Sequence, residues 1–218
     1  MSRAVVFDLD GTLIDSAPDI HAAANRLMVS HGFAGFTPEE TRAFIGHGVP
    51  HFIACCLRAR GAEAAGELHR QMVGEFIAGD ETAVTLTEVY PGVHAALERL
   101  ANMGLAHAIC TNKPVAPARA VLAHLGLEGH FPVVIGGDSC PVRKPDPAPL
   151  QAAAAGLGAT RVLYVGDSEV DAETSVRAGL PFALFTEGYR KTSLAEIPHQ
   201  TAFADFALLP DIAADLLT

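Results

Sequence analysis

The stretch AVVFDLDGT, residues 4–12, decides how the rest of this 218-residue chain is interpreted. An apolar run that reads as a buried strand ends at two carboxylates, Asp8 and Asp10, which lie close together in an extended chain. Gly11 permits a sharp turn or a close approach of the backbone to a ligand. A carboxylate pair in this position needs a cation, a proton, or separate roles as nucleophile and acid.

A calcium-binding loop is the simplest alternative for two closely spaced aspartates. An EF-hand loop would need a third Asp or Asn before its glycine and a glutamate near its end. In this chain Gly11 follows Asp10 directly, and Asp19 stands where the glutamate would be. The pattern therefore disfavours a calcium loop.

The composition limits the classes of partner. The net charge is −10, from 15 basic and 25 acidic side chains, which argues against nucleic-acid binding because such binding depends on a basic surface. A few local cations can still attract a small anion into a cleft. We see no secretory signal at the start and no uncharged apolar stretch long enough to span a bilayer, so we expect a cytoplasmic protein with no membrane partner.

After residue 90, short apolar segments alternate with segments of helical pattern, several of which are followed by a glycine that can cap a helix. Short, nearly continuous apolar strands separated by helices indicate an α/β fold with a parallel sheet covered on both faces. The expected strands are 4–7, 105–110, 132–135, 162–165 and 181–185, and the expected helices are 91–103, 115–125, 148–157, 170–178 and 210–217.

Residues 15–84 do not show this alternation of strands and helices, and their pattern is mostly helical with no strong strand. Such an insert after the first strand predicts a second, smaller domain over the end of the sheet. We therefore expect a core made of residues 1–14 and 85–218 and a helical cap made of residues 15–84. The expected cap helices are 18–30, 38–44, 50–60 and 62–78.

Polar residues follow four of the predicted strands, and the carboxyl ends of parallel strands lie on one edge of a sheet, where ligands bind. Taken singly, Thr111 can cap a helix, Lys144 can be solvated, and Asp167 can open the next helix. Their occurrence together at successive strand ends indicates one cleft instead. The residues are Asp8 and Asp10, Thr111 and Asn112, Lys144, and Asp167 and Asp171.

This set of groups suggests phosphoryl transfer through a carboxylate. A cation held by Asp8 and Asp167 would reduce the repulsion between an anionic nucleophile and a phosphate, and oxygen ligands beside phosphate favour Mg²⁺. Thr111 and nearby backbone N–H groups can bind phosphate oxygens, and Lys144 adds a positive charge. One aspartate of the first pair attacks and the other moves protons, but the residues alone leave open which does which.

The segments DLDGT at residues 8–12, Thr111, Lys144 in RKPDP, and GDSEVD at residues 166–171 resemble, in order, the four motifs of the haloacid dehalogenase (HAD) superfamily. The resemblance covers essentially the whole chain. It implies a Rossmann-like, doubly wound parallel sheet with a helical cap inserted after the first motif.

The resemblance also implies roles for these residues. Asp8 would be the nucleophile that forms an aspartyl-phosphate, and Asp10 the general acid and base. Asp8, the backbone carbonyl of Asp10 and Asp167 would hold Mg²⁺. Thr111 and Lys144 would bind phosphate, with Asn112 beside them, and Asp171 would support the metal ligands or Lys144.

Three further segments, DSAPD at residues 15–19, FIGHGVP at residues 44–50 and YPGV at residues 90–93, resemble the phosphoglycolate phosphatases of that superfamily. The resemblance implies that the IGHG stretch of the cap faces the active site. His47, with backbone groups of Gly46 and Gly48, would then read the substrate carboxylate. We expect a small phosphorylated metabolite as the substrate and a monomer or homodimer as the oligomeric state.

Other branches of the superfamily fit less well or stay open. A dehalogenase lacks the second aspartate of motif one, which is present here as Asp10. A phosphonate hydrolase needs a cap lysine, and Lys113, Lys144 and Lys191 all lie outside residues 15–84. A phosphatase of broader specificity, a pyrophosphatase and a sugar-phosphate mutase remain open. A phosphate-binding interaction protein is the non-enzymatic alternative, although such a protein would be expected to lack Asp8 or Asp10.

Overall fold

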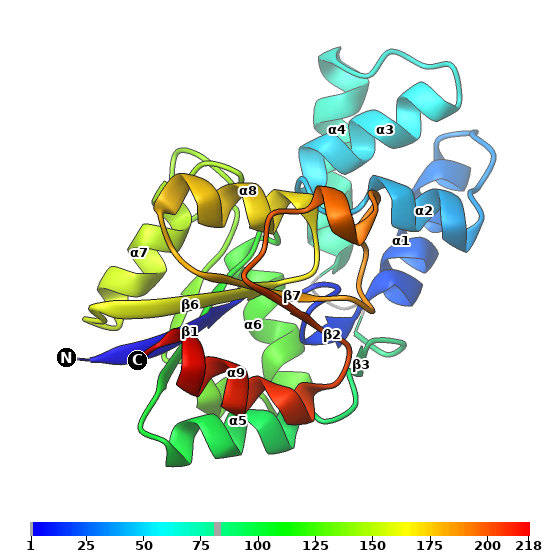
Figure 1. Cartoon of the computed structure of the whole chain (residues 1–218). Coiled ribbons are helices and arrows are strands. Elements are labelled where there is room, and N and C mark those ends of the chain that lie inside the picture. The colour runs from blue at the N-terminus through cyan, green and yellow to red at the C-terminus, as the bar shows by residue number, and fades with distance from the viewer. Residues whose placement is uncertain (1, 81–83) are drawn as a thin grey trace.

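A six-stranded parallel sheet forms the centre of the protein (Figure 1). The structure is a computed structural model that describes residues 2–80 and 84–218. Residues 1 and 81–83, which the predicted core and cap include, lie outside the described residues. In spatial order the strands are β5 (Val133–Ile135), β4 (Ala106–Cys110), β1 (Arg3–Phe7), β6 (Arg161–Gly166), β7 (Phe182–Phe185) and β8 (Thr201–Phe203).

The order of these strands fixes where a ligand site can form. Counted along the chain among the strands of this sheet, the spatial order is 3-2-1-4-5-6, which is the doubly wound Rossmann arrangement. The chain moves outward in one direction from β1 to β4 and β5, and in the other direction from β6 to β7 and β8. The direction reverses between β1 and β6, so the loops after these two strands diverge and leave a crevice between them.

The strand sequences are mostly apolar because both faces of the sheet are covered. Val5 and Phe7 of β1 join one hydrophobic cluster, while Val6 joins another on the opposite face, and all three side chains are fully buried. The first face is covered by α5 (Val93–Asn102), α6 (Val115–His124) and α9 (Leu209–Leu216), and the second by α7 (Ala148–Gly156) and α8 (Glu169–Ala178) (Figure 1).

The helices between β1 and α5 have a hydrophobic core of their own beyond the carboxyl ends of the strands (Figure 1). Ile53, Leu57 and Met72 are among its buried residues, and Tyr189 from the loop after β7 packs into it. The helices are α1 (Ala17–Ser30), α2 (Pro38–Phe44), α3 (Val49–Ala59) and α4 (Gly66–Asp80). The domain boundaries at residues 14/15 and 84/85 stay predictions.

The predicted elements agree with the structure to within one or two residues at most ends, with one larger difference. A helix over residues 62–78 was expected, but α4 begins at Gly66. Gly61 has a positive φ of 72°, and the N–H of Ala62 donates to the carbonyl of Leu57, at 2.9 Å. These contacts form a Schellman-type C-terminal cap on α3. Because Ala62 belongs to this cap, α4 cannot begin at that residue.

Some short elements were not predicted. β2 (Ile14–Asp15) pairs antiparallel with β3 (Glu88–Val89), so Asp15 lies in a strand although residues 15–84 were expected to contain no strong one. The edge strand β8 was also missed, because its sequence TAF is not an apolar run, unlike that of the equally short β5. Single-turn 3₁₀ helices occur at Glu128–His130, Leu194–Glu196 and Phe206–Leu208.

No helix within residues 2–80 and 84–218 combines the length and the hydropathy that a bilayer crossing requires.

His107 of β4 is a polar side chain inside the sheet. It is 3% exposed and packs against the rings of Phe7 and Phe131, with centroid distances of 5.9 and 6.2 Å. Its Nε2 makes no hydrogen bond with any described residue. Burial, with a smaller contribution from His130, lowers the pKa of His107 to about 4. The imidazole is therefore neutral in the folded protein near pH 7.

Replacing His107 with leucine is predicted to reduce the acid sensitivity of folding. The pKa of His107 is lower in the folded than in the unfolded state, so the unfolded chain binds more protons as the pH falls from about 6.5 toward 4, and stability decreases in that range. The loss should be about 2 kcal/mol at pH 5. Urea unfolding of the wild type and H107L at pH 7 and pH 5 measures it. A difference in unfolding free energy between the two proteins that does not change with pH would contradict this account.

Candidate active site

The predicted residues meet at the crevice between β1 and β6. Asp8 directly follows β1, and its N–H donates to the carbonyl of Val165 in β6, at 2.9 Å. Thr111 follows β4, and its N–H donates to Ile135 of β5, also at 2.9 Å. Asp167 follows β6, and Lys144 comes from the loop after β5. The backbone ladder of the sheet thus fixes the start of each loop, and the side chains of Asp8, Thr111, Lys144, Asp167 and Asp171 are buried.

The turn after Asp8 requires glycine at position 11. Gly11 has a φ of +87°, and a Cβ there would lie 2.6 Å from a carboxylate oxygen of Asp167 and 2.7 Å from the ring of Tyr189. The neighbouring Thr12 hydroxyl donates to Asp167 Oδ1, at 2.7 Å, in a fully buried contact. The motif-one loop therefore packs directly on Asp167.

Lys144 is the centre of a buried charge cluster. Its Nζ lies 2.9 Å from Asp8 Oδ1 and 2.7 Å from Asp171 Oδ1, and it donates to the Tyr164 hydroxyl at 2.9 Å. The Tyr164 hydroxyl in turn donates to Asp171 Oδ1, at 2.7 Å. Asp171 Oδ2 also accepts from the Ser168 hydroxyl, at 2.6 Å, and from the Ser168 N–H, at 3.2 Å, the second of which belongs to a capping box at the start of α8. Asp171 thus holds Lys144 in place from the first turn of a helix.

The protonation equilibria follow from burial and from these neighbours. Burial alone would lower the pKa of Lys144, but the Asp171 and Asp8 carboxylates outweigh it and raise the pKa. Burial would raise the pKa of Asp171, but the Lys144 ammonium outweighs it and lowers the pKa. Burial raises the pKa of Asp8, and burial together with the charges of Asp171 and Asp8 raises that of Asp167. The site therefore holds more buried carboxyl groups than Lys144 can neutralise, and the raised pKa values of Asp8 and Asp167 show that these groups favour a bound proton or a cation.

A divalent cation fits this arrangement. Asp8, Asp167 and Asp171 are buried and place carboxylate oxygens within 4.8 Å of one another. Asp8 Oδ1 makes no hydrogen bond of normal geometry with the described residues, although the Lys144 ammonium is near it. Asp171 is paired with the Lys144 ammonium and accepts from Ser168. By contrast, within the described chain Asp167 accepts only from the neutral donors Thr12 and Tyr189 and so keeps its charge available to a cation. Carboxylate oxygens are ligands of hard cations such as Mg²⁺.

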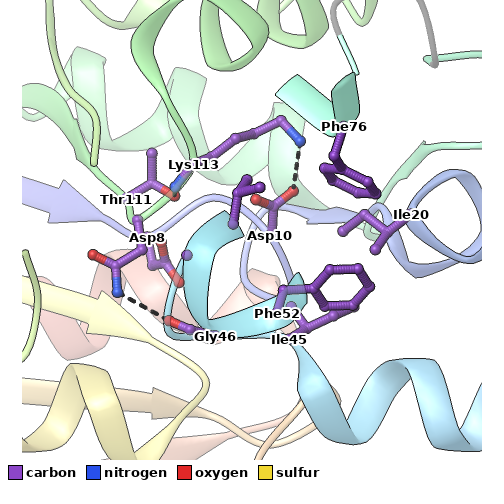
Figure 2. Close-up of a pocket in the computed structure, with 12 residues that line it drawn as sticks. Asp8, Asp10, Ile20, Ile45, Gly46, Phe52, Phe76, Thr111 and Lys113 are labelled. Carbon is purple, nitrogen blue, oxygen red and sulfur yellow. Dashed lines mark hydrogen bonds and ion pairs between the residues drawn. The ribbon is translucent and has the colours of Figure 1, made fainter. Parts of the chain in front are cut away.

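Asp10 has different surroundings from Asp8. The Ser16 hydroxyl donates to Asp10 Oδ1 at 2.5 Å, and the Lys113 ammonium lies 3.8 Å from the same oxygen. Asp10 lines the pocket shown in Figure 2, and its side chain remains 14% exposed. The Asp8 side chain is similarly exposed, at 12%, so the two aspartates differ in their partners: Asp10 is held by Ser16, from the segment that leads into α1, and Asp8 lies beside Lys144.

The pocket lies between the sheet edge and the helices α1, α3 and α4 (Figure 2). Its polar end belongs to the loops after β1 and β4, and its opposite wall is apolar. The polar group comprises Asp8, Asp10, Thr111, Asn112 and Lys113, and the apolar wall comprises Ile20, Ile45, Val49, Phe52 and Phe76, with Gly46 and Gly48 between them.

Asn112 joins the two sides of the pocket. Its side-chain N–H₂ donates to the carbonyls of Gly46, at 3.0 Å, and Lys144, at 3.1 Å, while its Oδ1 accepts from the N–H of Lys144, at 3.1 Å. Gly48 has a φ of +81°, and a Cβ there would lie 3.2 Å from the carbonyl of Asn112. Gly48 of the predicted IGHG stretch therefore lets the segment before α3 approach the core closely, whereas a Cβ at Gly46 would contact no other part of the described chain.

His47 lies apart from this pocket. Its side chain is exposed and lines a neighbouring hollow together with Glu169 and Lys191. This hollow also extends to Asp8 and Asp10. Partial burial, with the nearby charges of His51 and Lys191, lowers the pKa of His47. The imidazole is thus neutral near pH 7, and its predicted role in reading the substrate stays a prediction.

Tyr189 connects the site to the helices. Its N–H donates to Asp167 Oδ2, at 2.6 Å, and its hydroxyl donates to Asp15 Oδ1, also at 2.6 Å. The same hydroxyl accepts from the N–H of Ala17, at 3.0 Å, at the start of α1. Sequence reasoning missed Tyr189, as it missed Tyr164, because neither lies in a motif. Thr12 and Ser16 could have been found, since they flank the motif-one aspartates.

Comparisons with known proteins agree with this geometry. A family model described as haloacid dehalogenase-like hydrolase matches residues 2–179. A phosphoglycolate phosphatase of Cereibacter sphaeroides is 53% identical over 98% of each chain, and one of Rhodobacter capsulatus is 47% identical over 97% of each. A crystal structure of a predicted phosphoglycolate phosphatase from Haemophilus somnus has a TM-score of 0.87 at 26% identity, covering 97% of each chain. The chain belongs to the haloacid dehalogenase-like hydrolase family, as its four motifs predicted.

Lys144→Met is predicted to destabilise the fold by about 3–5 kcal/mol, because the change leaves the buried Asp171 without its counter-charge. In a D171N background, K144M should lower the free energy of unfolding by a smaller amount, with a difference of about 1.5 kcal/mol or more between the two backgrounds. Urea unfolding of the wild type, both single variants and the double variant gives this coupling energy directly. Equal costs of K144M in the two backgrounds would show that the ion pair does not stabilise the fold.

Proposed function

We propose that this protein is a Mg²⁺-dependent phosphomonoester hydrolase whose main substrate is 2-phosphoglycolate, which it converts to glycolate and phosphate. The observation that carries the proposal is the placement of Asp8 at the sheet crevice, beside Lys144 and Asp167. Relatives named phosphoglycolate phosphatase, up to 53% identical over nearly the full length, support the choice of substrate. The small polar end of the pocket suits a small phosphorylated metabolite.

The different surroundings of the two motif-one aspartates support separate roles for them. Asp8 is buried among Lys144, Asp167 and Asp171, where a phosphate group would meet positive charge and the Thr111 hydroxyl. Asp8 would attack phosphorus and form an aspartyl-phosphate while the ester oxygen leaves. Asp10, which faces the open pocket, would protonate that oxygen and then take a proton from the water that hydrolyses the intermediate.

The metal proposed for this reaction is Mg²⁺, held by Asp8, Asp167 and the backbone carbonyl of Asp10, with Asp171 in support. Bound there, it would supply positive charge that reduces repulsion between the Asp8 carboxylate and the phosphate. Thr12 and Tyr189 would keep Asp167 oriented, since each donates to one of its oxygens.

The cap is proposed to set the choice of substrate, with residues 15–84 as its extent. Gly46 and Gly48 line the pocket and Asn112 fixes their segment to the core, so these residues are proposed to contact or position the substrate, together with His47. A cytoplasmic location and a monomer or homodimer remain part of the proposal.

Phosphate release in the presence of Mg²⁺ tests the function. The substrates are 2-phosphoglycolate, a panel of sugar phosphates, nucleotides and pyrophosphate. We expect a preference of several hundredfold in kcat/KM for 2-phosphoglycolate, about 3–4 kcal/mol of discrimination, and loss of activity when EDTA removes the metal. A flat profile would retain the phosphatase chemistry and overturn the substrate, and activity on pyrophosphate alone would favour the pyrophosphatase alternative.

Asp8→Asn is predicted to abolish turnover, at least about a thousandfold, because an amide is a far weaker nucleophile than a carboxylate and cannot form the aspartyl-phosphate. Urea unfolding should show that the fold is retained. The matched control is Asp215→Asn, which removes the same charge from an exposed position on α9 and should turn over normally. Normal activity of D8N would overturn the mechanism.

A further inference from the structure

We propose that Lys113 is the residue that recognises the carboxylate of the substrate, so that the pocket selects phosphate monoesters of short 2-hydroxy acids. This inference rests on the proposed function and goes beyond it by naming a specificity residue on the core, outside the cap. It would make substrate selection a property of the loop that also carries Thr111.

Lys113 is well positioned for this role. It lies two residues after Thr111, its side chain is only 9% exposed, and its Nζ is 3.8 Å from Asp10 Oδ1. Its backbone is fixed on both sides, because its N–H donates to the Thr111 hydroxyl at 3.2 Å and its carbonyl accepts from Gly137 at 2.8 Å. Figure 2 shows the side chain extending from Thr111 past Asp10 toward Phe76. Lys144, the other lysine of the site, forms ion pairs with Asp8 and Asp171 and a hydrogen bond with Tyr164, and it does not line this pocket.

The order of groups along the pocket matches the order of groups in the substrate. Phosphorus must lie at Asp8, which attacks it, and the leaving ester oxygen must lie within reach of Asp10, which protonates it. In 2-phosphoglycolate the carboxylate carbon is two bonds beyond that oxygen. The ammonium of Lys113, next to Asp10, is therefore in the region where the carboxylate arrives.

The surroundings of Lys113 would make this recognition selective. Lys113 is the only cationic side chain among the described residues that line this pocket, and the wall opposite includes Ile20, Phe52 and Phe76. A carboxylate that enters a pocket with this apolar wall requires an opposite charge, and the Lys113 ammonium supplies one. A site built to pair a charged group rejects an analogue that lacks it more strongly than an apolar pocket can.

The other cations near the site are less suitable. Lys191 donates to the carbonyl of Ile45, at 2.9 Å, and lines the neighbouring hollow together with His47. His47 is neutral near pH 7, so it can donate or accept one hydrogen bond but brings no charge to a carboxylate.

Lys113 has one alternative role, which the test must separate. Its ammonium could serve only to orient Asp10, as a positioning residue. In that case its loss would reduce turnover of every phosphate monoester by a similar factor, because every substrate needs the same proton. Recognition of the carboxylate would instead reduce turnover only of substrates that carry one.

The experiment compares 2-phosphoglycolate with ethyl phosphate, in which a methyl group replaces the carboxylate, using the full chain with Mg²⁺. K113M should lower kcat/KM for 2-phosphoglycolate about a hundredfold and for ethyl phosphate less than about fivefold, with K113R retaining most of the preference. K113E should in addition turn over phosphoethanolamine, in which a positively charged aminomethyl group replaces the carboxylate, at least about tenfold faster than the wild type does.

The matched control is K191M, which removes a lysine that lines the neighbouring hollow, and H47A tests the competing assignment of the carboxylate to the cap. Both variants are assayed on the same pair of substrates. A selective loss in either of these variants with an unchanged preference in K113M would overturn the inference, and so would equal losses of K113M on both substrates. The proposed function fails separately, and the inference with it, if the wild type releases phosphate from neither compound or shows no preference between them.

Discussion

The burial of three carboxylates around one ammonium group is the constraint on which this structure depends. Asp8, Asp167 and Asp171 are brought together by strand ends that adjoin in space but are more than 150 residues apart in sequence, and Lys144 contacts two of them. Removing charges from water costs several kcal/mol for each ion unless they are paired and hydrogen-bonded. The fold meets this cost with the capping box of α8, the Tyr164 hydroxyl and the Thr12 hydroxyl. The negative charge left over is what makes the site suitable for a cation.

The strand order of the sheet determines where the site forms. Because the direction of the chain reverses between β1 and β6, the loops that carry Asp8 and Asp167 diverge and leave a crevice. The inserted helices then close that crevice with an apolar wall, while the loop after β4 supplies Thr111, Asn112 and Lys113. Reactive groups thus come from the rigid sheet edge, and the wall comes from the helices.

Much of this could be predicted from the sequence, for definite physical reasons. Strands buried on both faces are apolar runs, and helices here often end at glycine, so β1, β4, β6, β7 and most helices were expected at nearly the right residues. The four motifs also placed the residues that now meet at the crevice. The short strands β2 and β3 were missed because two residues carry no periodicity, and β8 was missed because its sequence is not an apolar run. Tyr164 and Tyr189 were missed because their roles arise only from tertiary contacts, and a tyrosine in a strand or loop has many ordinary uses.

Tyr189 connects the helices α1–α4 with the edge of the sheet. Its N–H is hydrogen-bonded to Asp167, its ring packs with the helices, and its hydroxyl is bonded to Asp15 and to the start of α1. A rigid-body swing of the helices away from the sheet cannot keep all of these contacts, so at least one must break. Each hydrogen bond contributes about 1 kcal/mol net. Any such opening would therefore be linked to the orientation of Asp167, and a product would escape most readily when that carboxylate is least firmly held.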